Sequence, residues 1–320
     1  MAAVKDQCTF NEDMGMFMVT SGTHLEKDIL MFFHASWGSK PGPYFPGPQP
    51  VSVERKHFPF LKNGHYLVCE KSDGVRYCMV CKLYGKEKVV CLINRSLQIL
   101  LVKIEISKNV LQGTVMDGEL LEDKRYIVYD CVMFAGQDTK AVSFAHRLKF
   151  VERFVSGIIK MKTDTIKVKT KVFYPLRDIL KYQNEVLVNV DYKTDGFVFT
   201  PINAPVKIGT HNMMFKWKPQ YKNTIDFQFK SKDPDTWSMY IQDRGKLVYE
   251  SEISKSAVKI EEEIAEDSIV ECEYMGTYWN PLLIRKDKTY PNGRKTFYNT
   301  LNNIREDIQV YEFHELFSST

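Results

Sequence analysis

The chain has 320 residues, of which 44% are hydrophobic and 26% are charged. This composition excludes a disordered or collagen-like protein, and the length allows one large domain or two unequal ones. The formal net charge of +4 is mildly basic, which suits an anionic substrate but is too small for a protein that coats nucleic acid. No stretch approaches the roughly 18 apolar residues of a membrane helix, and we expect a soluble, intracellular protein.

A proline-rich segment at residues 41–50 separates the first forty residues, for which the pattern predicts no element, from a region rich in strands. This segment, PGPYFPGPQP, holds five prolines and two glycines, so it cannot form a helix or a central strand. The runs that follow are short, β-branched or aromatic, and bounded by Gly, Asn or Asp, which predicts strands. They are residues 65–70, 77–84, 89–93 and 126–133. Apolar spacings of three and four predict helices at residues 144–159 and 177–188, so we expect a mixed α+β body of antiparallel sheets with flanking helices.

From about residue 224 the chain changes to short alternating segments separated by polar turns, a pattern that predicts a small barrel. Residues 254–267 are acidic, and we expect a solvated loop there. Apolar residues in the tail, residues 299–317, have helical spacing. We therefore predict two domains: residues 1–223, with the C-terminal helix 301–320 packing back on them, and residues 224–300.

The most specific local pattern is Lys71-Ser72-Asp73-Gly74-Val75-Arg76, with an Asp-Gly turn between two strand-like runs. A single K-x-D-G-x-R is modest support, because roughly one chain in a few hundred would carry it by chance. Further motifs follow in order: Asp117-Gly118-Glu119-Leu120, Tyr129-Asp130, Thr194-Asp195-Gly196-Phe197, Phe215-Lys216-Trp217-Lys218-Pro219 and Arg285-Lys286-Asp287-Lys288. Each alone is more simply a turn, an exposed edge strand or a packed aromatic. Only the ordered set favours a single functional site.

Strand geometry sorts these residues into faces. Positions two apart point the same way, so Lys216 and Lys218 share a face. The adjacent Tyr129 and Asp130 face opposite sides, which lets one hold a ligand while the other braces the scaffold. Cations on one side and acids on others predict a nucleotide-binding site.

If Lys71 is a nucleophile, its chemistry requires other cations nearby. Free lysine has a pKa of about 10.4, so attack at neutral pH requires neighbours that disfavour the ammonium form. Arg76, Lys216 and Lys218 would do this and would also neutralise a triphosphate. Transfer at phosphorus further needs in-line geometry and charge neutralisation, which a divalent metal supplies.

The ordered motifs resemble those of the covalent nucleotidyltransferase superfamily, which comprises capping guanylyltransferases and ATP- or NAD-dependent ligases. The resemblance covers most of the chain. It is closest to the compact capping guanylyltransferases of large DNA viruses that infect algae, on the stretch FPGPQPVSVERKHF before EKSDGVR and the ending RKDKTYPN. It implies an mRNA guanylyltransferase in which Lys71 attacks GTP, holds GMP covalently and passes it to a 5′-diphosphate RNA end, with release of pyrophosphate.

The resemblance also implies roles for single residues. Ser72 and Lys171 would select guanine, and Tyr129 would stack on it where the family more often has Phe. The catalytic residue would be Lys71, and the residues that bind GTP or GMP would be Ser72, Arg76, Arg95, Glu119, Tyr129, Lys171, Asp195, Lys216, Lys218, Asp226, Arg285, Asp287 and Lys288. Glu119 and Asp195 would also be the candidates for holding Mg²⁺ or Mn²⁺.

For the rest of the molecule, the resemblance implies an OB-fold barrel at residues 224–300. Its motif, Arg285, Asp287 and Lys288, would move to the β- and γ-phosphates and orient the departing pyrophosphate. No pattern of an RNA triphosphatase or a methyltransferase is visible, so we expect separate proteins for those steps. We further expect a monomer without membrane association, located in the nucleus or at a viral replication site.

Two rival functions remain open. An ATP-dependent polynucleotide ligase would share the lysine, the motif order and the barrel but would form lysyl-AMP. A nucleic-acid-binding protein with a degenerate nucleotidyltransferase fold would use the barrel as a platform for RNA. The intact motif set argues against the nucleic-acid-binding protein, and the ending RKDKTYPN resembles the capping branch rather than the ligases.

Overall fold

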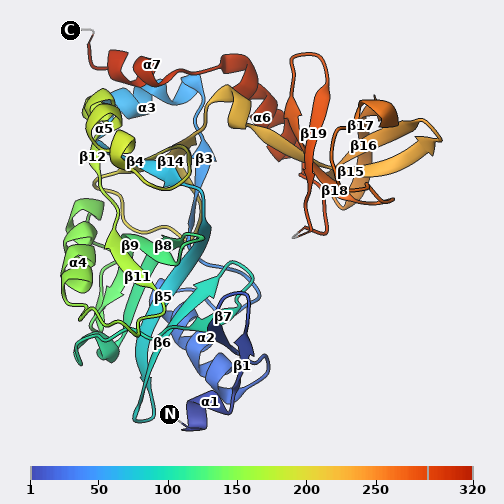
Figure 1. The fold of residues 1–320 in the computed structure, drawn as a ribbon. Coiled ribbons are helices and arrows are strands. Elements are labelled where there is room, and N and C mark those ends of the chain that lie inside the picture. Colours follow the sequence, from blue (N-terminus) through green and yellow to red (C-terminus); the bar gives the residue numbers. More distant parts are fainter. Residues whose placement is uncertain (1, 287, 319–320) are drawn as a thin grey trace. The chain divides into compact units, whose positions relative to one another are not determined.

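The computed structural model describes residues 2–286 and 288–318, and the chain divides into two compact units. The first unit comprises Met1–Val51 and Phe60–Lys216, and the second comprises Ser52–Pro59 and Trp217–Thr320. The helices are α1 (Ala2–Lys5), α2 (His24–Trp37), α3 (Phe58–Asn63), α4 (Phe144–Ser156), α5 (Ile179–Glu185), α6 (Arg294–Glu306) and α7 (Val310–Glu315). Figure 1 shows the elements in chain order from blue to red.

The first unit is built on a nine-stranded sheet in the order β1-β2-β7-β6-β5-β8-β9-β10, with β11 parallel to β9 and all other pairs antiparallel. Its strands are β1 (Cys8–Asn11), β2 (Met16–Val19), β5 (Val75–Tyr84), β6 (Glu87–Asn94), β7 (Ile99–Leu101), β8 (Thr114–Leu120), β9 (Arg125–Phe134), β10 (Gln137–Asp138) and β11 (Lys167–Thr170).

Alternation along β5 explains why helices cover both faces of this sheet. Cys78 and Val80 point to one face, where they join a core that includes Phe33 of α2. Met79 points to the other face, in a core that includes Phe154 of α4. Because both faces of the strand are buried, its sequence is a continuous apolar run. Figure 1 shows α4 beside β9 and β11.

A second sheet of the first unit carries the lysine motif. Its order is β12-β4-β13-β14-β3, formed by β12 (Tyr174–Pro175), β4 (Tyr66–Ser72), β13 (Thr194–Pro201), β14 (Gly209–Trp217) and β3 (Pro48–Ser52). The strand β3 takes up the end of the proline-rich segment at the edge of the sheet, where a missing backbone N–H costs no ladder hydrogen bond. Lys71 lies near the end of β4, which is flanked by β12 and β13.

The second unit contains a five-stranded antiparallel sheet in the order β17-β16-β15-β18-β19. Its strands are β15 (Thr224–Asp233), β16 (Thr236–Asp243), β17 (Lys246–Ser254), β18 (Ile269–Tyr274) and β19 (Trp279–Ile284). After three hairpin-connected strands, the fourth returns beside the first, as in a five-stranded Greek-key barrel. Phe297 and Ile304 of α6 are part of its core.

The structure confirms the α+β class and most of the expected elements. The four predicted strand runs correspond to β4, β5, β6 and β9, and the two predicted helices to α4 and a shorter α5. Residues 255–267 between β17 and β18 are mostly exposed, as predicted for the acidic segment. The tail differs from the single helix that we predicted, because it forms two helices, α6 and α7. Asp307 has a left-handed φ of 41° and ends α6. The packing of residues 301–320 on the first domain, and the boundary at residue 223, stay predictions.

Candidate functional site

Lys71 lies against Asp195, which comes from the neighbouring strand β13. The Lys71 Nζ is 2.9 Å from Oδ1 and 3.0 Å from Oδ2 of the Asp195 carboxylate. The pairing of β4 with β13 shifts register between Thr194 and Phe197, and a bulge of this kind re-aims a side chain. Gly74 is needed in the turn after Lys71, because a Cβ there would lie 2.8 Å from the carbonyl oxygen of Leu120. The lysine motif and the Thr194-Asp195-Gly196 motif therefore meet.

Glu119 is the second acid close to the lysine. It lies on β8 opposite Arg76 of β5, next to the Gly74 turn. Burial raises the pKa of the Glu119 carboxyl to about 7, although the charges of Lys71, Lys171 and Arg76 act to lower it. The pairing of β5 with β8 therefore brings the acid of the Asp117-Gly118-Glu119 motif to the turn of the lysine motif.

Arg76 is held in a buried network with Asp117. Its Nε donates to Asp117 Oδ1 at 2.9 Å, Nη2 donates to Oδ2, and Nη1 donates to the carbonyl oxygen of Pro48. The guanidinium also lies 5.0 Å from the centre of the Phe45 ring. The proline-rich segment thus contributes directly to the position of this arginine.

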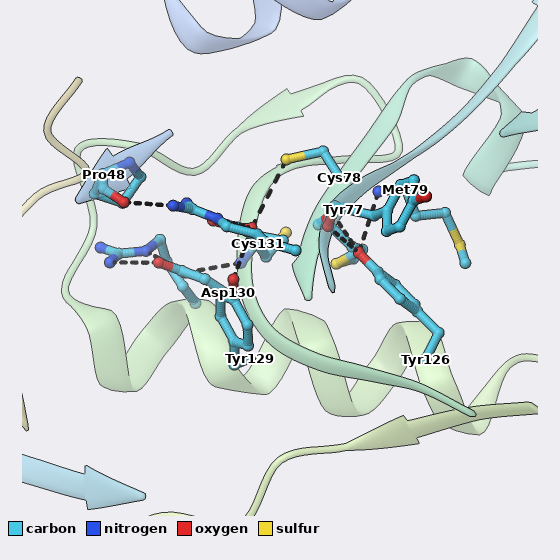
Figure 2. Close-up of polar contacts among 12 residues, drawn as sticks. Pro48, Tyr77, Cys78, Met79, Tyr126, Tyr129, Asp130 and Cys131 are labelled. Carbon is cyan, nitrogen blue, oxygen red and sulfur yellow. Dashed lines mark hydrogen bonds and ion pairs between the residues drawn. The ribbon is translucent and has the colours of Figure 1, made fainter. Parts of the chain in front are cut away.

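Tyr129 and Asp130 diverge, as strand geometry predicts. The Tyr129 hydroxyl donates to Asp117 Oδ1 at 3.1 Å, on the side of Arg76. Asp130 points to α4, where Arg147 Nε donates to its Oδ1 at 2.7 Å. Figure 2 shows Pro48, Tyr129 and Asp130 within these contacts. Asp130 therefore braces the sheet against α4, and Tyr129 stays with the site.

Ser72 and Lys171 also meet, although 99 positions separate them. Lys171 Nζ donates to the Ser72 hydroxyl and, at 2.7 Å, to Oε1 of Glu70. Both residues are 5% exposed. Lys171 directly follows β11, whose parallel pairing with β9 fixes its position.

Three further predicted residues, Arg95, Lys216 and Lys218, lie on or directly after strands β6 and β14. Arg95 is exposed in the turn after β6, whose last residue, Asn94, pairs with Tyr77, the neighbour of Arg76. Lys216 lies on β14 and is half-buried, as is Lys218 directly after the strand. Trp217 between them is buried, as expected for a residue on the opposite face.

In the second unit, Asp226 forms ion pairs with two cations of the terminal motif, Arg285 and Lys288. Arg285 Nη1 lies 3.2 Å from Asp226 Oδ1 and 3.0 Å from Glu271 Oε2, and Lys288 Nζ pairs with Asp226 Oδ2. Asp226 also exchanges two hydrogen bonds with Asn292: its N–H donates to the side-chain oxygen, and its carbonyl accepts from the Asn292 N–H. Asp287 lies outside the described residues.

Comparison with known proteins identifies the family. A model described as the mRNA capping enzyme, catalytic domain, matches residues 15–220, and a model of the mRNA capping enzyme, C-terminal domain, matches residues 190–313. The chain belongs to the mRNA capping enzyme family. These matches confirm the resemblance to capping enzymes and, with the observed sheets, the predicted class of fold and of enzyme.

Individual relatives agree with the family match. The chain is 28% identical to an mRNA-capping enzyme of Danio rerio, over 82% of this chain and 48% of the relative. It is 33% identical to an mRNA-capping enzyme subunit alpha of Schizosaccharomyces pombe, over 58% of this chain and 53% of the relative. The chain thus spans about half the length of these relatives. Among solved structures, a mycobacterial DNA ligase D complexed with ATP and MES is 12% identical, with a TM-score of 0.41, over 77% of this chain and 95% of that one.

Sequence reasoning missed three residues that cluster around Lys171, namely Glu70, Tyr182 and Tyr192. Glu70 is buried and accepts hydrogen bonds from the hydroxyls of Tyr182 and Tyr192 as well as from Lys171. Glu70 had a signal in the sequence, because a carboxylate at the end of the apolar run HYLVCE has to be paired. The two tyrosines had none, since only the tertiary fold brings them to Glu70.

The donor set of the site suits a hard divalent cation. Asp195 contacts Lys71, Glu119 lies at the Gly74 turn that follows the lysine, and carboxylate oxygens are the ligands that Mg²⁺ and Mn²⁺ prefer. Within residues 2–286 and 288–318, no three His, Cys, Asp or Glu side chains gather as a complete metal site.

No helix in the described part of the chain is both long and apolar enough to cross a membrane.

Proposed function

We propose that this chain is an mRNA guanylyltransferase that transfers GMP from GTP to the 5′-diphosphate end of RNA. The observation that carries the proposal is the contact of Lys71 with Asp195 beside Glu119, within a region that matches the capping-enzyme catalytic domain. A part-buried lysine whose amine contacts a carboxylate has a group that can take up its proton, which attack at phosphorus requires.

In the first step the Lys71 amine attacks the α-phosphorus of GTP. A nitrogen–phosphorus bond forms, the bond to the pyrophosphate oxygen breaks, and pyrophosphate leaves. Lys71 has to lose a proton before attack, and the Asp195 carboxylate that touches Nζ is placed to receive it. In the second step the RNA diphosphate attacks the same phosphorus and releases Lys71.

The other residues bind and orient GTP in this proposal. Ser72 and Lys171 face the guanine base, and Tyr129 stacks on it. The ribose and the phosphates are contacted by Arg76, Arg95, Glu119, Lys216 and Lys218. Arg76 acts with Asp117 as its partner, because two of its guanidinium nitrogens donate to this carboxylate. A divalent ion, Mg²⁺ or Mn²⁺, held by Glu119 and Asp195 would neutralise phosphate charge.

The terminal motif acts on the β- and γ-phosphates. Arg285, Asp287 and Lys288 would orient pyrophosphate for departure, and Asp226 would hold the two cations in position. We propose the domain bounds 1–223 and 224–300 for these two functions, with the last residues, 301–320, returning to the first domain.

The cellular setting is also a proposal. The chain would act as a monomer on GTP and diphosphate-ended RNA, with a separate RNA 5′-triphosphatase before it and a separate cap methyltransferase after it. Its location would be the nucleus or a viral replication site.

Labelling with radioactive nucleotide tests the proposal. The protein is incubated with α-labelled GTP or ATP and Mg²⁺ or Mn²⁺, denatured and separated on a gel, and the adduct is then chased into diphosphate-ended RNA. We expect label from GTP, loss of label in Lys71→Ala, and normal label in Lys88→Ala, which changes an exposed lysine. Label from ATP alone would support the ligase function instead, and label in Lys71→Ala would exclude this nucleophile.

A further inference from the structure

Glu70 is a buried carboxylate that the proposed reaction leaves without a role. It is 2% exposed, next to Lys71 in sequence, and alternation along β4 places it on the same side as Ser72. Lys171 Nζ lies 2.7 Å from Glu70 Oε1, and the hydroxyls of Tyr182 and Tyr192 donate to Oε2 and Oε1. A buried charge with three donors around it is fixed in position.

The two tyrosines remain donors to this carboxylate. Burial, and then the negative charge of Glu70, raise the pKa of the Tyr182 and Tyr192 hydroxyls well above the usual range. Both phenols therefore keep their protons at neutral pH. Both oxygens of the carboxylate accept hydrogen bonds from donors that stay protonated, so Glu70 is a fixed partner for the Lys171 ammonium.

All three N–H donors of the Lys171 ammonium form hydrogen bonds within the protein. It donates to Glu70 Oε1 at 2.7 Å, to the Glu70 backbone oxygen at 3.3 Å and to the Ser72 hydroxyl oxygen. An ammonium has three donors. Ser72 Oγ thus accepts from Lys171, so the Ser72 hydrogen points away from Lys171.

A hydroxyl oriented in this way prefers one kind of base edge. Ser72 can donate its proton to a carbonyl such as O6 of guanine. An exocyclic amine, as on adenine, would have to donate to the remaining lone pair of Ser72 beside the Lys171 cation, which the positive charge disfavours. The hydrogen bonds that link Glu70, Lys171 and Ser72 therefore favour a purine with a carbonyl at position 6 over one with an amine there.

We propose that Glu70 is a specificity-determining positioning residue, which holds Lys171 so that the Ser72 hydroxyl presents its proton to the 6-carbonyl of the purine. This inference rests on the proposed guanylyltransferase function and deepens it. Glu70 acts only through Lys171 and Ser72 and takes no part in the attack on phosphorus.

The test compares nucleotides within one preparation. Adduct formation with ITP, which keeps the 6-carbonyl but lacks the 2-amino group of guanine, is measured against ATP for the full chain and for Glu70→Gln. Glu70→Gln removes the charge that orients Lys171. We expect the ITP-to-ATP ratio of kcat/KM to fall about tenfold or more, the discrimination lost with one oriented hydrogen bond. Because it is a ratio, a lower fraction of folded protein does not change it.

Controls separate this effect from a loss of structure. Glu105→Gln makes the same substitution at an exposed carboxylate paired with Lys88, and it should keep the wild-type ratio. If Glu70→Gln does not fold, Glu70→Asp keeps the charge but shortens its reach, and the ratio should still fall, by less. An unchanged ratio in whichever of these two variants is folded would overturn the role of Glu70 alone. A wild-type protein that forms adduct with ATP but not with GTP would overturn the proposed function as well.

Discussion

Asp117 supports two residues of the candidate site, since it accepts hydrogen bonds from both Arg76 and Tyr129. Asp117 is 1% exposed, so Asp117→Asn leaves a buried guanidinium without its counter-charge. We expect this change to lower the free energy of unfolding by about 3–5 kcal/mol, the cost of breaking a buried ion pair from one side. Denaturation in guanidinium measures it.

The matched control is Asp123→Asn, whose side chain is 51% exposed and pairs with Arg125. Because the Asp123 carboxylate is exposed to solvent and Arg125 also pairs with Asp191, this change should cost less than about 1 kcal/mol. Equal costs for the two substitutions would show that the Arg76 network does not depend on the Asp117 charge.

Glu119 predicts a pH dependence of stability for the ligand-free protein. Burial raises the pKa of its carboxyl from 4.5 to about 7, so the folded state binds this proton more tightly than the unfolded chain. The stability from this proton is complete below about pH 4.5 and is lost as the pH rises through about 7. Glu119→Gln cannot ionise and does not lose this stability. Its free energy of unfolding relative to the wild type should therefore increase by an amount on the order of 1–3 kcal/mol as the pH rises from 5 to 8.

Melting temperatures of both proteins at the two pH values test this dependence. The stability difference between Glu119→Gln and the wild type should change with pH in the stated direction. A constant difference would mean that Glu119 ionises in the folded protein as it does in the unfolded chain.

Among the elements of the second unit, Asn292 connects the segment before α6 to strand β15 through Asp226. Its side-chain oxygen accepts from the Asp226 N–H at 3.0 Å, and its N–H donates to the Asp226 carbonyl at 2.7 Å. Asn292→Ala removes the first of these bonds and leaves a part-buried N–H without its acceptor. We expect a loss of about 1–3 kcal/mol in the free energy of unfolding.

Asn299→Ala on the exposed face of α6 is the control for this prediction, and it should change stability by no more than about 0.5 kcal/mol. If the two substitutions have the same effect, the side chain of Asn292 does not hold the loop that precedes α6.

Elements with a strong local pattern could be predicted, and those set by long-range contacts could not. The apolar run of β5 and the helical spacing of α4 were visible in the sequence, because their burial repeats along the chain. The break in the tail was not, since the left-handed backbone at Asp307 leaves no periodic signal. The edge strand β3 was not predicted either, because its prolines are tolerated only through its place at the sheet edge.

The site divides in the same way. The motif order predicted that Lys71 and Asp195 belong together, and the structure places them in contact. Lys171 was assigned through the family resemblance, and its contact with Ser72 depends on the parallel pairing of β11 with β9. Glu70, Tyr182 and Tyr192 form a cluster that no spacing rule indicates, since three separate segments supply it.

At the scale of the whole molecule, the proposed reaction divides the work between the two units. The first unit holds Lys71, Asp195 and Glu119, which act on the α-phosphorus in both steps. The second unit holds Arg285 and Lys288 on Asp226. A function of these cations at pyrophosphate is required in the first step only, because RNA attacks after pyrophosphate has left.

Arg285→Ala should therefore slow adduct formation far more than transfer. Arg285 contacts both Asp226 and Glu271, so it is held in a defined orientation, and a guanidinium oriented toward a leaving phosphate is a strong charge-assisted donor. We expect the rate of lysyl-GMP formation to fall by about tenfold to a hundredfold, in line with the loss of one such donor in a transition state. Transfer of GMP from a preformed adduct to RNA should stay within about twofold, since no pyrophosphate is present.

Single-turnover labelling and a chase of isolated adduct measure the two steps separately. Lys286→Ala is the neighbouring control, because this lysine is 72% exposed and pairs with Glu262 rather than with Asp226. Both steps should proceed normally in that variant. An equal loss of formation and transfer in Arg285→Ala would place Arg285 at the nucleotide throughout the cycle, and the division of work between the two units would then be wrong.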